Sequence, residues 1–389
     1  MPKSRKRRSS TRRPTSGRRE LPPWTKTLFL ADEAERRGDA AGALALMEAA
    51  GNDDDGRPIW RPWRVEYLSQ FATLGPVLPR WAHARWILAQ AGQWLDGDNR
   101  ACVQAAMQKA IDVRGGVHCL PGHDTADRRA RVMDHDWVYR QLVLYDLGKL
   151  DRFCRRRASA DLLAGADDMG VWSRASIDAY RLVERRSDSI GWRRERDDEL
   201  VRTPNTGCAA MLWPGDPVLG RLVPTGDQQI FESAPLPVTD AVVKRVAADP
   251  DDWLAALGEW DQYGEIVPLT RPTEHAGLLV ELSPRIWQNV VCDQPDTLTF
   301  PSFSPVKLAQ SALDLGLFLL DEFEPPDFPH LDTWACLACA FVEPEVVRHL
   351  VDHADAGQRA LLARLAGRLA EPAATVCRRM ARGDLPLAA

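Results

Sequence analysis

YRLVERRSDSIGWRRERDDEL, residues 180–200, begins a stretch ending at Val238 in which short runs of alternating apolar and polar residues are separated by turns. The turns are Ser187-Asp188-Ser189, Pro214-Gly215-Asp216 and Thr225-Gly226-Asp227. Alternation with a period of two indicates strands, and turns about ten residues apart are typical of small antiparallel sheets. The stretch therefore predicts one small β barrel or curled sheet, with strands within 180–183, 190–196, 208–213, 218–223 and 228–232.

Both flanks of this stretch have the periodicity of helices. Residues 24–51, 86–113 and 138–156 each predict a helical hairpin that turns near Gly38, Gly97 or Gly148, and the unequal spacing of these glycines indicates an irregular array rather than a repeat. Further helices are expected at 240–248, capped by Thr239, at 305–322, capped by Ser304, and at 345–381. The predicted fold is mixed and mainly α. Its expected divisions are a disordered basic tail (1–20), a helical region (21–175), the β module (176–238) and a helical C-terminal region (239–389).

The composition favours a globular, non-membrane protein. With 389 residues, of which 45% are hydrophobic, the chain can bury a large core. No apolar run reaches the roughly 18 residues that a transmembrane helix needs. Glu20 and Pro22 stand where a secretory signal would begin its apolar segment, and the eight scattered cysteines are typical of reduced thiols. These features predict a cytoplasmic protein without a disulfide framework.

The formal net charge of −5 conceals a strong asymmetry. Residues 1–20, called the arm below, carry a charge of +8, whereas residues 21–389 carry −13. Apart from Met1 the arm has no large apolar side chain, so nothing offsets the cost of ordering it, about 1–2 kcal/mol per residue. Cations of this density can neutralise phosphates and release counterions. The candidate nucleic-acid-binding residues are Lys3, Arg5, Lys6, Arg7, Arg8, Arg12, Arg13, Arg18 and Arg19.

Two other groups of side chains resemble nucleic-acid surfaces but favour a structural interpretation. In the β module, arginines between 181 and 202 alternate with acidic residues, which favours cross-strand ion pairs over binding. Five tryptophans lie close together with arginines between them, at positions 60, 63, 81, 86 and 94. Tryptophan is buried on average, so packing is favoured over base stacking.

Two clusters contain the residue types of metal sites. His118, His123, His135 and Asp136 form the first, and the His135-Asp136 pair resembles the motif of the His-Asp phosphohydrolases. The resemblance implies a divalent metal that activates water, with His83 or His118 as a further ligand and Asp146 or Asp151 as the distant carboxylate. The structural alternative is that Asp124 and Thr125 cap a helix whose solvated face includes Asp134 and Asp136.

The second cluster is Cys336-x-x-Cys339 with His349 and His353. Two thiolates and two imidazoles can form a tetrahedral zinc site. The alternative is a buried helix, because Trp334, Leu337 and Phe341 surround the cysteines.

The chain has no glycine-rich phosphate loop, no Gly-x-Ser-x-Gly elbow and no His-Glu-x-x-His pair. The sequence therefore favours a non-catalytic binding or adaptor protein, without a predicted cofactor, whose arm contacts nucleic acid or a ribonucleoprotein. One alternative is a scaffold that binds proteins in a helical groove. Another is a metal-dependent phosphohydrolase at the cluster 118–136.

Overall fold

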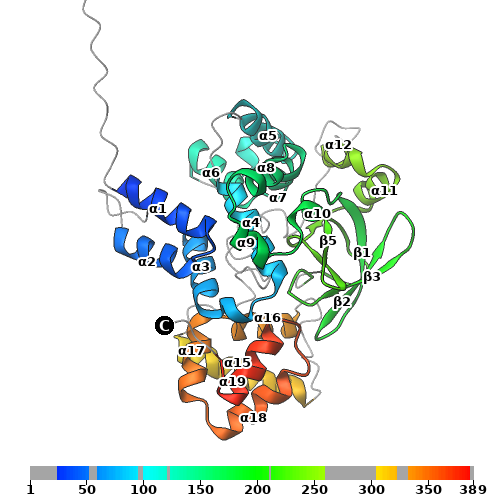
Figure 1. The fold of residues 1–389 in the computed structure, drawn as a ribbon. Coiled ribbons are helices and arrows are strands. Elements are labelled where there is room, and N and C mark those ends of the chain that lie inside the picture. Colours follow the sequence, from blue (N-terminus) through cyan, green and yellow to red (C-terminus); the bar gives the residue numbers. More distant parts are fainter. Residues whose placement is uncertain are drawn as a thin grey trace, which may run out of the picture.

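The computed structural model describes residues 24–51, 59–94, 100–120, 123–209, 212–258, 304–321 and 332–385. It is mainly helical, with one small antiparallel sheet (Figure 1). The N-terminal helices lie beside the sheet, and the helices between residues 305 and 382 lie beneath both in the view of Figure 1. In the described ranges every helix is too short or too polar for a bilayer span.

The N-terminal part is a series of short helices. They are α1 (Trp24–Arg36), α2 (Ala40–Ala50), α3 (Pro62–Leu74), α4 (Arg80–Gln93), α5 (Arg100–Asp112), α6 (Thr125–His135), α7 (Trp137–Gln141), α8 (Lys149–Arg156), α9 (Ala160–Gly165) and α10 (Met169–Trp172). Two 3₁₀ turns, η1 (Gly75–Val77) and η3 (Val117–Cys119), and one π-helical turn, η4 (Leu142–Asp146), lie among them.

The hairpin predicted for 24–51 is confirmed as α1 and α2. Gly38 has a φ of 80°, which only glycine adopts at low cost, and the side chain of Asp39 caps α2 by accepting from the Gly42 amide. The hairpin at 138–156 is also present, as α7, η4 and α8 around Gly148, whose φ is 63°. Helices α4 and α5 flank the third predicted turn, but Gly97 lies outside the described residues.

The β module is a five-stranded antiparallel sheet of order β3-β2-β1-β4-β7, accompanied by a two-stranded hairpin, β5-β6. The strands are β1 (Asp178–Arg185), β2 (Ser189–Arg194), β3 (Leu200–Pro204), β4 (Pro217–Gly220), β5 (Leu222–Thr225), β6 (Gln228–Phe231) and β7 (Leu236–Pro237). The hairpin follows β4 after Arg221, and its strand β6 contacts β3. The sheet is not closed into a barrel.

One predicted strand is wrong. The described residues of 208–213 lie outside the strands, and the third strand is β3 instead. Cys208 and Ala209 are buried but belong to no strand. Their burial therefore comes from packing against neighbouring elements and not from a place in the sheet. In β3 the side chains of Val201 and Thr203 are buried, whereas those of Leu200 and Arg202 are exposed. Three acidic residues just before the strand obscured this alternation in the sequence.

The two faces of the sheet belong to different cores. Ala179 and Leu219 face an apolar cluster shared with α5, α7, α11 and α12, whereas Tyr180 and Val218 face the cluster around Trp192 and Phe231. Adjacent residues on a strand point to opposite faces, which explains this division. Gly220 is required here, because a Cβ at this position would lie 2.5 Å from the Phe231 ring.

The C-terminal part is again helical. Its elements are α11 (Asp240–Ala248), the 3₁₀ turn η5 (Pro250–Asp252), α12 (Trp253–Leu257), α15 (Pro305–Leu320), α16 (Thr333–Phe341), α17 (Pro344–His353), α18 (Ala356–Leu365) and α19 (Ala373–Arg382). The predicted caps are confirmed: Thr239 accepts from Val242, and Ser304 accepts from Lys307. Helices α15–α19 share one apolar core with α1–α4, in which Leu68 and Val347 are fully buried.

Candidate functional site

The cationic residues of the arm all lie outside the described residues. The first described element after the arm is α1, at the upper left of Figure 1. Its outer face carries Lys26 with Phe29 and Leu30, whose side chains are 60% and 46% exposed. Its inner face buries Ala31, Ala34 and Glu35.

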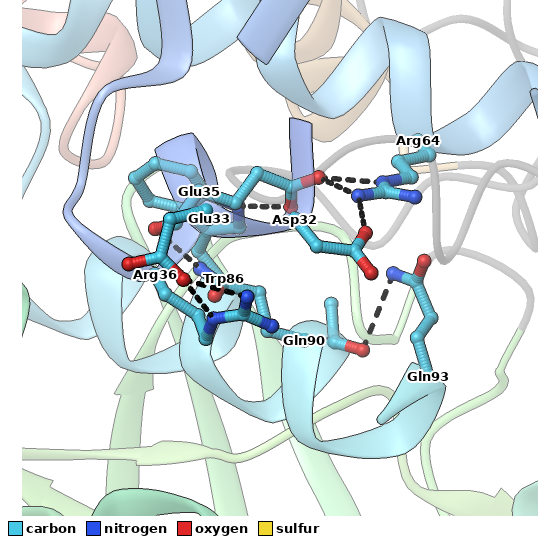
Figure 2. Close-up of polar contacts among 9 residues, drawn as sticks. Asp32, Glu33, Glu35, Arg36, Arg64, Trp86, Gln90 and Gln93 are labelled. Carbon is cyan, nitrogen blue, oxygen red and sulfur yellow. Dashed lines mark hydrogen bonds and ion pairs between the residues drawn. The ribbon is translucent and has the colours of Figure 1, made fainter. Parts of the chain in front are cut away.

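Glu35 attaches α1 to α3 and α4 (Figure 2). Arg64 of α3 donates from Nε to Oε1 of Glu35 at 2.5 Å and from Nη2 to Oδ1 of Asp32 at 2.5 Å. On the opposite side, Nε1 of Trp86 donates to Oε2 of Glu35 at 3.3 Å. The side-chain amide of Gln90 donates to the backbone carbonyl of Glu35, also at 3.3 Å. A carboxylate held from two helices fixes both the position and the rotation of α1.

Burial raises the pKa of Glu35 from its usual 4.5, and the positive charge of Arg64 opposes this shift. Such a shift can mark a catalytic acid. In this protein both carboxylate oxygens are already bonded, and the residue is 2% exposed. We therefore assign Glu35 the role of an anchor for α1.

A second buried polar network joins the helical region to the β module. Glu232, which follows β6, accepts from Arg140 at 2.8 Å, from Gln141 at 2.6 Å and from the Ser233 hydroxyl at 2.7 Å. Arg221 donates from Nε to Oε1 of Gln141 at 2.7 Å and lies over the Tyr145 ring, 4.2 Å from its centroid. Tyr145 belongs to the π-helical turn η4. Such turns often occur at functional sites, but Arg140, Gln141, Arg221 and Glu232 bond to one another and are buried.

The arginines of the β module form ion pairs within the module and to adjacent residues, as predicted. The pairs are Arg181–Glu195 (2.8 Å), Arg181–Asp240 (2.8 Å), Arg186–Glu184 (3.1 Å), Arg193–Glu195 (3.5 Å), Arg193–Asp198 (3.7 Å), Arg194–Asp197 (2.9 Å), Arg194–Glu199, Arg196–Asp178 (3.1 Å) and Arg202–Glu184 (2.6 Å). A phosphate would have to displace these carboxylates, so the sheet surface is a poor binding site for nucleic acid.

Four of the five tryptophans are packed, as predicted, whereas Trp94, at the end of α4, is partly buried, with its ring centroid 6.0 Å from that of Phe153. Trp60, Trp63, Trp81 and Trp86 are each less than 9% exposed, and Trp86 stacks on Phe71 with centroids 4.4 Å apart. Buried rings cannot stack on bases.

The cluster at 118–136 does not assemble into a metal site among the described residues. Asp124 caps α6, accepting from the amides of Ala126 and Asp127, as the structural alternative predicted. The placement of Asp136 on a solvated helix face is wrong, because Asp136 is 1% exposed. It ends α6 and caps α7, accepting from the Tyr139 amide, and it pairs with Arg114. His118 lies in η3, His123 precedes α6, and His135 ends α6.

The further ligands implied by the phosphohydrolase resemblance lie in other settings. His83 on α4 packs edge-on against Phe71, Asp146 lies 3.5 Å from Arg221, and Asp151 pairs with Arg155. Within the described ranges, no three His, Cys, Asp or Glu residues come close enough together to hold a metal ion.

The cysteine and histidine pairs near the C-terminus are also separate. Cys336 and Cys339 are buried in α16, among the apolar residues that the sequence indicated. His349 and His353 lie on α17 and stack on each other, with centroids 4.7 Å apart. Among the described residues, the buried-helix interpretation is therefore supported.

One group of arginines was not singled out in the sequence. Arg359, Arg378 and Arg382 border a cavity of about 590 Å³ between α18 and α19. The sequence could have drawn attention to this region, because residues 355–385 contain six arginines and only three acidic residues. It could not show that three of these arginines, on two different helices, line the same cavity.

No model of a known protein family matches this chain, and the searches of curated proteins and of solved structures found no match. Its function is therefore inferred from its own residues.

Proposed function

We propose that this protein is a non-catalytic binding or adaptor protein whose arm contacts nucleic acid or a ribonucleoprotein. The observation behind the proposal is the separation of charge, with +8 on residues 1–20 and −13 on the rest. An acidic body repels a phosphate backbone, so the attraction comes from the arm.

The geometry supports this choice in two ways. The arginines of the β module are paired with carboxylates, which leaves the arm as the stronger candidate for phosphate contacts. Moreover, Glu35 and Arg64 hold α1 rigidly on the body, so a ligand bound by the arm would be kept close to the exposed side chains of Phe29 and Leu30.

The test is fluorescence anisotropy of a labelled single-stranded RNA, titrated with the full chain over a series of salt concentrations. Each neutralised phosphate contributes about −0.7 to the slope of log K against log salt, so nine contacts would give a slope of about −6. A protein lacking residues 1–20 is expected to bind weakly and with a slope near zero. Equal binding by the full and the truncated chain would refute the proposal.

A matched pair of variants separates arm binding from a general effect of charge. Arg7→Gln with Arg8→Gln removes two charges from the arm, and Arg194→Gln with Arg202→Gln removes two from the sheet. The arm variant should make the slope of log K against log salt less negative by about 1.4. The sheet variant should leave this slope unchanged, because Arg194 and Arg202 are already paired with carboxylates.

A scaffold that binds other proteins is the second proposal. Phe29 and Leu30, adjacent on the outer face of α1, favour it, because a partner could cover them. Affinity purification of the tagged chain with and without nuclease distinguishes the two: partners that disappear with nuclease are held through nucleic acid.

A further inference from the structure

The open hollow between α18 and α19, called the cavity below, is lined by arginines, which we call the rim, and by small residues, which we call the floor. The rim is formed by Arg359 of α18 and by Arg378 and Arg382 of α19, and the floor by Ala360, Ala363, Ala366, Gly367 and Ala381. In Figure 1 the two helices lie side by side at the base of the molecule. The cavity is open to solvent and has a volume of about 590 Å³.

Two of the rim arginines are held in place by the protein. Arg359 donates from Nε to the Ala354 carbonyl at 3.1 Å, and its Nη1 lies so close to Gly383 that a Cβ there would be 2.8 Å away. Arg378 donates from Nη1 to the Thr375 hydroxyl at 3.1 Å, and its Nη2 lies 3.5 Å from Oε1 of Glu371. Both guanidinium groups are thus oriented before any ligand arrives, which lowers the entropic cost of binding.

The third rim arginine, Arg382, has no side-chain hydrogen bond or ion pair to any residue that the structure describes. Glu371 is the acidic residue that pairs with the rim, at the long distance of 3.5 Å. The segment 355–385 carries a net charge of +3 in a chain whose net charge is −5. With Glu371 paired to Arg378, the three arginines keep a net charge of +2, which an anion between them would balance.

We propose that this cavity binds a phosphate group, either as free phosphate or as the phosphate of a small ester. Guanidinium groups match phosphate oxygens in a bidentate geometry, and the dianion would balance the charge of the rim. The alanine methyls offer apolar contact to the organic part of an ester. The site is separate from the arm and does not depend on its function.

A purely structural role for these arginines makes a different prediction. Cations in the last turn of α19 interact with the helix dipole, and arginine stems can cover alanines. If this were their whole role, substitution would change stability, and no phosphate compound would bind.

The test is isothermal titration of the full chain with inorganic phosphate and with adenosine monophosphate, at constant ionic strength. Arg382→Gln should weaken binding about tenfold or more, because it removes a charge-assisted hydrogen bond. Arg368→Gln is the matched control, since Arg368 is exposed on the same segment but does not line the cavity. Ala363→Leu should also weaken binding, by filling the floor, without changing any charge.

The outcomes separate the possibilities. Tighter binding of adenosine monophosphate than of inorganic phosphate indicates an ester as the ligand, and equal binding indicates free phosphate. The proposal is overturned if neither compound binds the unaltered protein, or if Arg368→Gln weakens binding as much as Arg382→Gln. Repeating the titrations with the nine arm cations changed to Gln should give the same affinities, which keeps this result independent of the arm.

Discussion

Nη2 of Arg140 lies 2.8 Å from Oε2 of Glu232, although 92 positions separate the two residues in the chain. Arg140 is on α7 in the helical region, and Glu232 directly follows β6 in the β module. Both side chains are buried. Through this pair, and through Gln141 beside it, the β module and the helices that precede it stabilise each other.

Glu232→Gln is expected to destabilise the protein by about 3–5 kcal/mol, because it leaves the buried Arg140 without its counter-charge. Urea unfolding monitored by tryptophan fluorescence measures the change. The control is Glu33→Gln on the exposed Glu33–Arg36 pair, which should cost less than about 1 kcal/mol. Similar losses in the two variants would contradict the structural importance of the Arg140–Glu232 pair.

His83 should make stability depend on pH. Burial lowers the pKa of His83 from its usual 6.5, so the unfolded chain binds the proton more readily than the folded one. The stability that the neutral His83 ring contributes to the folded state is therefore fully present above pH 6.5. It is lost as the pH falls through the lower pKa of the folded state. His83→Gln removes this dependence.

The measurement for His83 is the difference in unfolding free energy between the two proteins at several pH values. The unaltered protein should lose stability relative to His83→Gln as the pH falls from about 7 to about 5. His353→Gln, on an exposed residue of α17, is the control that should show a smaller change. If the difference in unfolding free energy between the unaltered protein and His83→Gln stayed constant across this range, His83 would not be the source of the pH dependence.

The cysteines should react with a thiol reagent in the order of their exposure. Cys102 and Cys119 are exposed, whereas Cys336 and Cys339 are buried in α16. Burial raises the pKa of Cys154 to about 12, which keeps this partly buried thiol protonated and slow to react. Brief iodoacetamide labelling followed by mass spectrometry should modify the first two and spare the others.

Labelling of the unfolded chain in guanidinium chloride is the control, in which all these cysteines should react at similar rates. If Cys336 or Cys339 were modified as fast as Cys102 in the native protein, the burial of α16 would be disproved.

The predictable part of the fold was local. Thr239 and Ser304 could be recognised as helix caps because a cap bonds to an amide two or three residues away. The third strand was misplaced because the apolar run at 208–213 resembled a strand more than 200–204 did. Burial of Cys208 and Ala209 comes from the surrounding elements and leaves no local signature.

The candidate sites were predictable to a smaller extent. The alternation of charges in the β module indicated ion pairs, but the pairing of Arg181 with Asp240 of α11 could not be foreseen, because it spans 59 positions. The two metal clusters were plausible by residue type. Each was excluded among the described residues by geometry alone, since spacing in the sequence does not show which side chains converge.

The sequence by itself determined the separation of charge between the arm and the body, the helical character of both flanks and the caps at Thr239 and Ser304. These properties depend on composition and on contacts within a few residues. Only the tertiary structure decided that Glu35 meets Arg64, that Arg140 meets Glu232 and that three arginines surround one cavity. Such contacts form when distant segments pack, and the free energy that selects them comes from burial shared across the whole core.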